Sequence, residues 1–184
     1  MVFAQLAARH GQVRGEEHTW VRNALTLDQV RARDLMTPRR VVKTMPASMT
    51  VGEAIGQTDR WVHSRVPVRE GEDADSISGV IYRREIFDAA VAGQKDRRLG
   101  EFARKLETVP IDTKAHKLLR MFLQKRRHLF ALISEHGGFE GIVTLEDVLE
   151  SLLGEEIVDE HDQIVDMQEH ARRTNPHAEE GDPR

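Results

Sequence analysis

The chain has 184 residues, which is enough for one compact domain or two small ones. It contains no cysteine, so disulfides, thiolate zinc sites and cysteine nucleophiles are excluded. The net charge of −4 does not indicate binding to nucleic acid. No apolar run approaches the ~20 residues that span a bilayer. We therefore expect the chain as given to be soluble, with no nucleic-acid partner.

Residues 1–30 are predicted to form a helical segment. Glu16 favours a helix start, and Trp20, Ala24 and Leu27 recur at helical spacing. This segment has no counterpart elsewhere in the chain. It therefore lies outside the repeated part of the protein.

Two later segments carry the same pattern. Residues 79–85 read Gly-Val-Ile-Tyr-Arg-Arg-Glu, and residues 141–147 read Gly-Ile-Val-Thr-Leu-Glu-Asp, with the two glycines 62 positions apart. A β-type segment precedes each, at 64–68 and at 128–133. A repeat of this length indicates two copies of one folding unit, which usually pack together and form sites at their seam.

The first unit is predicted over residues 31–96, in the order β-α-β-β-α. Its expected elements are a short strand at 41–45, a helix that begins with a Thr50–Glu53 capping box, strands at 65–68 and 77–82, and a helix at 84–92.

The second unit is predicted over residues 97–154 and has the same order after an extra helix. Its expected elements are helical residues 99–105, a strand at 108–109, a helix at 114–125, strands at 129–134 and 139–144, and a helix at 145–153 that Gly154 ends. Residues 155–184 are predicted to be an acidic hinge followed by a disordered tail. The fold class is thus α/β (α+β).

The strongest candidate site is the Thr144-x-x-Asp147 motif. It lies where a strand runs into a helix, so free backbone amides and the positive end of the helix dipole favour an anion such as phosphate there. A carboxylate one turn further on can accept hydrogen bonds from ribose hydroxyls. The alternative is simple helix capping, with Thr144 as N-cap and Asp147 as the third helical residue. The motif alone favours capping, because such caps are common.

The first unit departs from this motif, since Tyr82 replaces Thr144 and Glu85 replaces Asp147. A tyrosine cannot cap a helix as a short hydroxyl does. If the chain holds one nucleotide site, the second unit should therefore anchor it. Ser64 precedes a buried strand and either reaches the seam or lies on an exposed strand edge.

The sequence shows no complete catalytic set. Gly-x-Ser-x-Gly, the phosphate-binding P-loop and Gly-x-Gly-x-x-Gly after a strand are all absent. The nine histidines show no His-Glu-x-x-His pattern, and the acidic run at 155–162 is interpreted as a solvated hinge rather than a magnesium site. We therefore expect a protein that is not an enzyme and that binds no metal through its own side chains.

Several motifs in the same order resemble a known family. They are Asp34-Leu-Met-Thr-Pro-Arg39, Ser64-Arg-Val-Pro-Val68, Gly79-Val-Ile-Tyr82, His128-Leu-Phe-Ala-Leu132 and Gly141-Ile-Val-Thr-Leu-Glu-Asp-Val-Leu149. Together they resemble a tandem pair of CBS domains, or Bateman module, of the CNNM/CorC (hemolysin-like) magnesium and cobalt transport family. The resemblance covers roughly residues 16–165 and implies two CBS repeats in pseudo-two-fold symmetry.

The resemblance also implies a ligand and its site. Family pairs bind adenine nucleotides, ATP or AMP, often with magnesium held through the phosphates. Carried over by motif, Thr144 and Asp147 would hold the phosphate side and the ribose. By the same resemblance Thr37, Ser64 and Val66 would line the cleft between the units, with Ile142 against the base.

Partners and location follow from the resemblance in the same way. Residues 1–30 would connect to an N-terminal transmembrane transporter module, placing the pair on the cytoplasmic face of the cell membrane. The helices after each glycine strand would form a homodimer interface. The implied function is nucleotide-sensing control of a divalent-cation transporter. The alternatives are a ligand-free dimerisation module and a regulatory piece of a metabolic enzyme.

Overall fold

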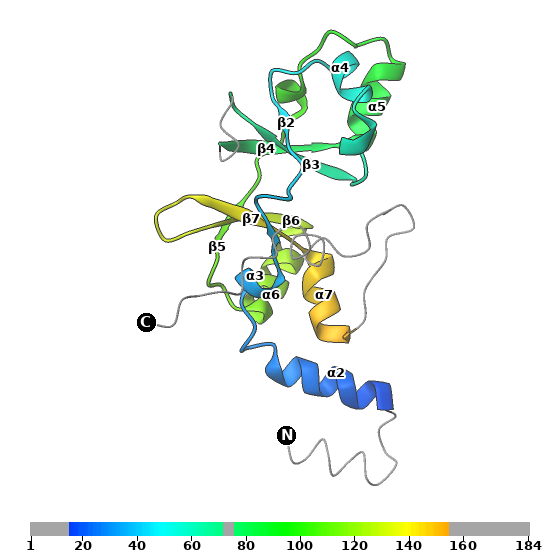
Figure 1. Ribbon diagram of the computed structural model, residues 1–184. Helices are drawn as coiled ribbons and strands as arrows, with labels where there is room; N and C mark the ends of the chain where they lie inside the picture. The colour runs from blue at the N-terminus through cyan, green and yellow to red at the C-terminus, as the bar shows by residue number, and fades with distance from the viewer. Residues whose placement is uncertain (1–14, 72–75, 155–184) are drawn as a thin grey trace.

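The computed structural model of the protein describes residues 15–71 and 76–154, and every structural statement below concerns these residues (Figure 1). They form a mixed α and β structure of four layers. Two small sheets face each other in the middle, and the helices of each repeat cover the outer side of its own sheet (Figure 1). The predictions for 1–14 and for the acidic hinge and tail at 155–184 lie outside the described residues.

The first repeat has a three-stranded sheet in the order β2-β3-β4. Its elements are β2 (Met45–Pro46), α4 (Val51–Ile55), the 3-10 turn η1 (Thr58–Arg60), β3 (Arg65–Arg69), β4 (Ile77–Tyr82) and α5 (Arg83–Val91). β2 pairs with β3 in parallel, and β3 pairs with β4 as an antiparallel hairpin. The predicted β-α-β-β-α order is confirmed.

The second repeat builds a four-stranded sheet in the order β1-β7-β6-β5. Its elements are β5 (Thr108–Pro110), α6 (Ala115–Lys125), β6 (Leu129–Ile133), β7 (Phe139–Thr144) and α7 (Leu145–Leu153). Gly154 ends α7 with a φ of 76°, a left-handed conformation that favours glycine. The fourth strand, β1 (Thr37–Pro38), comes from the chain that precedes the first repeat.

Two short segments are exchanged between the repeats. The helix α3 (Ala32–Leu35) precedes the first repeat, yet Ala32 and Leu35 are buried in the core of the second. The 3-10 helix η2 (Leu99–Phe102) precedes the second repeat, yet Leu99 is buried in the core of the first. Each unit therefore completes its core with residues that lie in sequence before the other unit.

Three clusters of buried side chains form the core. One lies under α6 and α7 and includes the stacked rings of Phe122 and Phe130, whose centroids are 4.4 Å apart. A second lies under α4 and α5. The third joins the inner faces of the two sheets and includes Val80 of β4 and Leu129 of β6. The repeats are thus held together mainly by apolar contact between their sheets.

Two local predictions are wrong. Residues 41–42 do not form a strand; the strands in this region are β1 and β2, on either side of them. Helical structure after Leu99 ends at Phe102 instead of 105, because Arg104 pairs with Val80 at the edge of the first sheet. Tertiary pairing therefore overrides the helical tendency of this segment.

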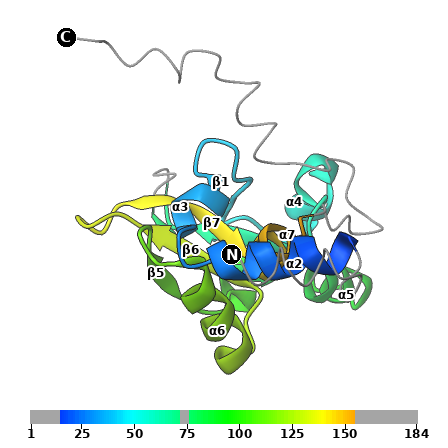
Figure 2. The ribbon, with the colours of Figure 1, turned by 90° about the horizontal axis from the view of Figure 1, so that it is seen from below.

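The helix α2 (Gly15–Thr26) packs against α7, and Leu27 just after it is buried in the core of the second repeat. Figure 2, a view from below, shows α2 crossing α7. The predicted helix is therefore confirmed over its described part. It is anchored to the helix that begins at the candidate site.

Candidate functional site

Strand β1 brings the chain before the first repeat onto the edge of the second repeat. Thr37 lies directly opposite Ile142 of β7, and Arg39 N–H donates a hydrogen bond of 2.8 Å to the Glu140 carbonyl. Directly opposed residues of an antiparallel pair project to the same face of the sheet. Thr37 and Ile142 therefore share a face, and Ile142 packs on the apolar cluster between the sheets.

Thr144 and Asp147 lie at the junction of β7 and α7 and form a complete capping box. The Thr144 backbone N–H and hydroxyl donate to Asp147 Oδ2 at 2.6 and 2.9 Å, and the Asp147 N–H donates to Thr144 Oγ1 at 3.2 Å. Because side chains alternate along a strand, Thr144 shares the face of Ile142. The capping interpretation is thus confirmed, and Asp147 Oδ1 is still available to accept a hydrogen bond.

Burial raises the pKa of Asp147 to about 7, from an ordinary value of 3.8. The two hydrogen bonds from Thr144 lower the pKa but do not offset the loss of hydration, and the nearby carboxylates of Glu150 and Glu146 raise it further. A carboxyl that is half protonated near neutral pH can accept a hydrogen bond from a hydroxyl or donate one to a phosphate oxygen. Such perturbed groups cluster at functional sites.

The other two predicted site residues belong to the first repeat. Ser64 is exposed, and its carbonyl accepts a hydrogen bond from Arg83 N–H at the start of α5. Val66 is 1% exposed and packs in the core of the first repeat, so its side chain contributes to packing. The structure therefore groups Thr37, Ile142 and the capping box, and places Ser64 and Val66 on the facing repeat.

In the first repeat, the position equivalent to the candidate site is occupied by a side chain of the protein itself, Arg104. Arg104 pairs with Val80 as Thr37 pairs with Ile142, and it forms an ion pair with Glu85. Its guanidinium lies 4.8 Å from the centroid of the Tyr82 ring. The positions that correspond to Thr144 and Asp147 are thus bridged by an internal arginine.

A second arginine lies at the same ring. Arg65 is directly opposite Tyr82 in the β3–β4 pair, with its guanidinium 5.8 Å from the ring centroid. The sequence did not single out Arg104, because it lies in no motif and its place beside β4 depends on the exchange of segments. The only local sequence feature that could have indicated its place is a strand-like pattern around residue 104.

Further ionisable side chains lie near the candidate site. His128, the residue before β6, lies 3.7 Å from Glu146 of α7. Within residues 15–71 and 76–154, no three His, Cys, Asp or Glu side chains are placed to hold a metal ion. No helix in the same part of the chain is long and apolar enough to cross a membrane.

Comparison with known proteins gives curated relatives of similar sequence. The chain is 35% identical over 171 residues to a UPF0053 protein of Synechocystis, covering 93% of this chain and 49% of that protein. It is 32% identical over 137 residues to the magnesium and cobalt efflux protein CorC of Escherichia coli (strain K12), covering 74% of this chain and 46% of CorC. The chain therefore spans about half the length of these relatives.

Solved structures agree with the sequence comparison. The CBS domain of a bacterial CNNM/CorC family Mg²⁺ transporter matches with a TM-score of 0.77 and 28% identity, covering 86% of this chain and 95% of that one. A structure described as that kind of domain in complex with ATP matches with a TM-score of 0.71 and 29% identity, covering 76% and 98%. The predicted α and β fold of paired repeats is thus confirmed.

The family model for the CBS domain matches twice, at residues 32–92 and 99–154. Each match covers one repeat together with the exchanged segment that precedes it in sequence, α3 or η2. The chain therefore belongs to the CBS-domain family and carries a tandem CBS pair of the kind found in CNNM/CorC and hemolysin-like proteins.

Proposed function

We propose that the chain is a regulatory module that senses an adenine nucleotide and controls a membrane transporter of divalent cations. The observation that carries the proposal is the grouping of Thr37, Ile142 and the Thr144–Asp147 box on one face at the N-terminus of α7. A helix N-terminus favours phosphate, and the free Oδ1 of Asp147 suits a ribose hydroxyl. The similarity to a CBS domain in complex with ATP supports the choice of nucleotide.

Magnesium enters this proposal as a partner of the phosphates. The described residues hold no cluster of metal ligands, whereas a nucleoside triphosphate brings its own oxygen ligands for the ion. Magnesium would therefore lower the negative charge that the helix N-terminus and the neighbouring carboxylates must accommodate. We expect nucleotide binding to be tighter with magnesium than without it.

The packing of α2 on α7 supports a route from the site to the preceding chain. α7 begins at the capping box and contacts α2, and Leu27 anchors the end of α2 in the core below α7. A ligand that favours one position of α7 therefore biases α2 as well, by no more than its differential affinity for the two positions. We propose that the pair lies on the cytoplasmic side of a transmembrane module. Helix α2 would transmit this bias to that module.

A homodimer through the helices is part of the proposal. Phe87 and Val91 of α5, the helix that follows the Gly79 strand, are 42% and 90% exposed. Exposed apolar side chains on the outer helices are typical of an association surface. Sedimentation of the chain and of Val91→Glu tests this: a dimer that the substitution weakens supports it, and a monomer at all concentrations contradicts it.

The decisive experiment separates a binding site from a helix cap. Isothermal titration of the chain with ATP, ADP and AMP, with and without magnesium, is compared for Thr144→Ala and Thr50→Ala. Thr50 forms the same capping box with Glu53 at the start of α4, so it is a matched control for stability. Each substitution removes an N-cap and costs about 1 kcal/mol.

We expect the wild-type chain to bind a nucleotide saturably, Thr144→Ala to lose the binding and Thr50→Ala to keep it. Binding by none of the nucleotides would contradict the proposal and leave a dimerisation scaffold as the better account. Equal loss in both variants would mean that the caps affect binding only through the stability of the fold. Release of inorganic phosphate from ATP above background would instead indicate an enzyme.

A further inference from the structure

One outer surface of the second repeat is strongly basic. Residues 113–134, which include α6, contain six Lys or Arg and no Asp or Glu. Ala115, Leu118 and Phe122 of α6 are buried, whereas the cationic residues are exposed. We name this surface the α6 basic face, and it consists of Lys114, Lys117, Arg120, Lys125, Arg126 and Arg127.

The cations at the N-terminal end of the α6 basic face oppose the helix dipole, whereas Lys125 lies in the last turn, where a cation is favourable. Lys114 occupies the N-cap without a capping hydrogen bond from its side chain, and the first turn contains no acidic residue. Cations near a helix N-terminus are unfavourable, because the helix dipole is positive there. A local rule broken in this way is expected where a surface serves a partner, here an anionic one.

The acidic side chains beside this face neutralise only part of its charge. Glu107 forms ion pairs with Lys125 and Arg127, so one carboxylate meets two cations. Asp112, just before α6, pairs with Arg31 and Arg33 of the exchanged segment. The surface therefore retains excess positive charge after these pairs are formed.

The complementary charge lies in the same chain. Residues 155–169 contain seven Asp or Glu and no Lys or Arg, whereas residues 1–154 carry 24 basic and 21 acidic residues. The acidic stretch begins directly after α7, and α7 shares a core cluster with α6. Fifteen residues span up to about 50 Å when extended, which is ample to cover a helix of 11 residues.

We propose that residues 155–169 dock on the α6 basic face of their own chain. Covalent attachment gives the acidic segment an effective concentration of order mM at this face, an advantage that a free anionic partner lacks. Ile157 and Val158 in the segment match the exposed Leu123, which lies among the cations. The interaction does not depend on nucleotide binding, so it stands or falls separately from the proposed function.

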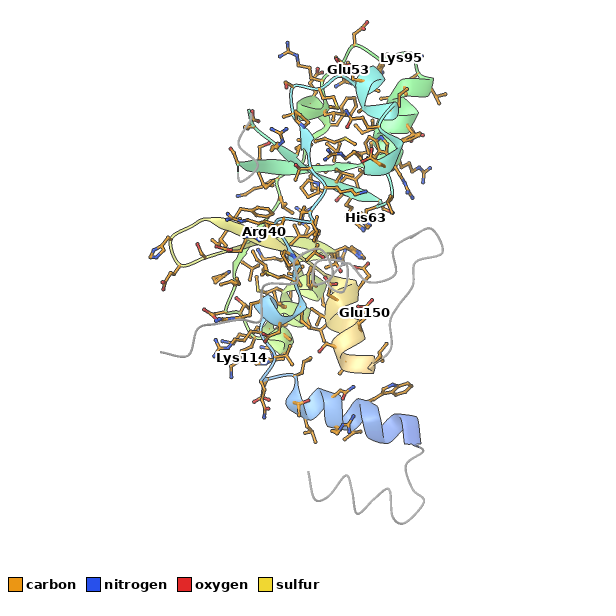
Figure 3. All side chains as sticks on the ribbon, in the orientation of Figure 1. Arg40, Glu53, His63, Lys95, Lys114 and Glu150 are labelled. Atoms are coloured by element: carbon orange, nitrogen blue, oxygen red, sulfur yellow. The ribbon has the colours of Figure 1, made fainter. Side chains whose placement is uncertain are left out.

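Zero-length carbodiimide cross-linking of the full chain, read by mass spectrometry, tests the proposal directly. The reagent joins a carboxylate to a lysine only when the two are in contact. Lys114 lies beside α6, whereas the exposed Lys95 lies at the far end of the first repeat (Figure 3). We expect cross-links from residues 155–169 to Lys114 and Lys117 to exceed those to Lys95 at least about fivefold at low salt.

Two changes should remove this preference. In 1 M salt the screening length falls to about 3 Å, so coupling to Lys117 should approach that to Lys95. Arg120→Glu with Arg126→Glu reverses two charges but leaves every lysine as a reporter, and should lower coupling to Lys117 at least about fivefold. The matched control Lys95→Glu should leave coupling to Lys117 unchanged.

An equal mixture of ¹⁴N- and ¹⁵N-labelled chains distinguishes the possible occupants. Cross-links within chains of one isotope support the proposal, and cross-links between isotopes overturn it in favour of a second copy. Coupling to Lys114, Lys117 and Lys95 at equal yield also overturns it. The basic face would then be open to an outside anion, for which vesicles containing phosphatidylserine and short RNA are the next probes.

Discussion

The backbone carbonyl oxygen of Thr37 lies so close to Gly141 that a β-carbon at Gly141 would approach it to 2.3 Å. Gly141 therefore allows β1 to pair with β7, and this pairing carries Thr37 to the candidate site. The other repeat shows the same device, since a β-carbon at Gly79 would approach the Arg104 carbonyl oxygen to 2.7 Å. The first glycine of each repeated motif thus leaves room for the backbone of the exchanged segment that pairs with its strand.

Gly141→Ala should destabilise the protein. The obstructing atom is backbone, so β1 must shift away from β7, and such overpacking costs about 1–3 kcal/mol. Chemical denaturation measures the change. Gly56→Ala is the control, because its φ is −73° and its nearest neighbour would be 3.4 Å away, so it should be neutral or stabilising by up to about 1 kcal/mol. Equal stability of the two variants would contradict the close approach.

Leu35→Ala should weaken the second repeat, and Leu99→Ala should weaken the first. Leu35 is 8% exposed in the core of the second repeat, and Leu99 is fully buried in the core of the first. Each truncation should cost roughly 2–5 kcal/mol. Hydrogen exchange should show lost protection in β6 and β7 for Leu35→Ala, and in β3 and β4 for Leu99→Ala. The reverse pattern would contradict the exchange of segments.

Asp147 should make the protein less stable as the pH rises. With a pKa of about 7 when folded and an ordinary value of 3.8, the folded chain holds one more proton than the unfolded chain between these limits. The free energy of unfolding therefore falls as pH rises from about 4 to 7, and is level on either side. Thermal unfolding from pH 5 to 8 should show a smaller decrease for Asp147→Asn than for the wild type.

The comparison with Asp147→Asn isolates the contribution of this carboxyl to the pH dependence. Asn can still accept the hydrogen bonds from Thr144 through its side-chain oxygen, so the cap is retained. Parallel pH profiles for the two proteins would mean that hydration of Asp147 keeps its pKa near the ordinary value.

The chain should bind one nucleotide. This prediction rests on the proposed function and on Arg104. In the first repeat, at the position equivalent to the candidate site, Arg104 forms an ion pair with Glu85 and stacks on the Tyr82 ring. Titration should give one ligand per wild-type chain. The combined variant Tyr82→Thr, Glu85→Asp and Arg104→Thr restores the motif of the second repeat and should add a second, weaker site. Two ligands bound to the wild type would show that the arginine does not block the first repeat.

Breaking the ion pair between Arg104 and Glu85 should change the free energy of unfolding little. The Arg104 and Glu85 side chains are 56% and 37% exposed, and exposed ion pairs contribute roughly 0–1 kcal/mol. A double-mutant cycle with Arg104→Ala and Glu85→Gln should therefore give a coupling energy below about 1 kcal/mol. A much larger coupling would assign the bridge to the core of the fold.

Local pattern was sufficient to predict much of this protein. The repeated glycine motifs predicted two like units, and the alternating apolar residues predicted β3, β4, β6 and β7, because side-chain periodicity reports which face of an element is buried. The Thr144–Asp147 spacing predicted the capping box, since a cap forms between residues three apart and needs no distant partner.

Only the tertiary structure decided which unit each connecting segment completes. Residues 32–38 and 99–104 carry no strong periodicity, and their places follow from hydrogen bonds to strands more than 20 residues away. The same exchange brings Thr37 to Ile142 and Arg104 to Tyr82, and so distinguishes the two equivalent sites. Pairing between distant segments depends on the shape of the assembled sheets, which local sequence does not encode.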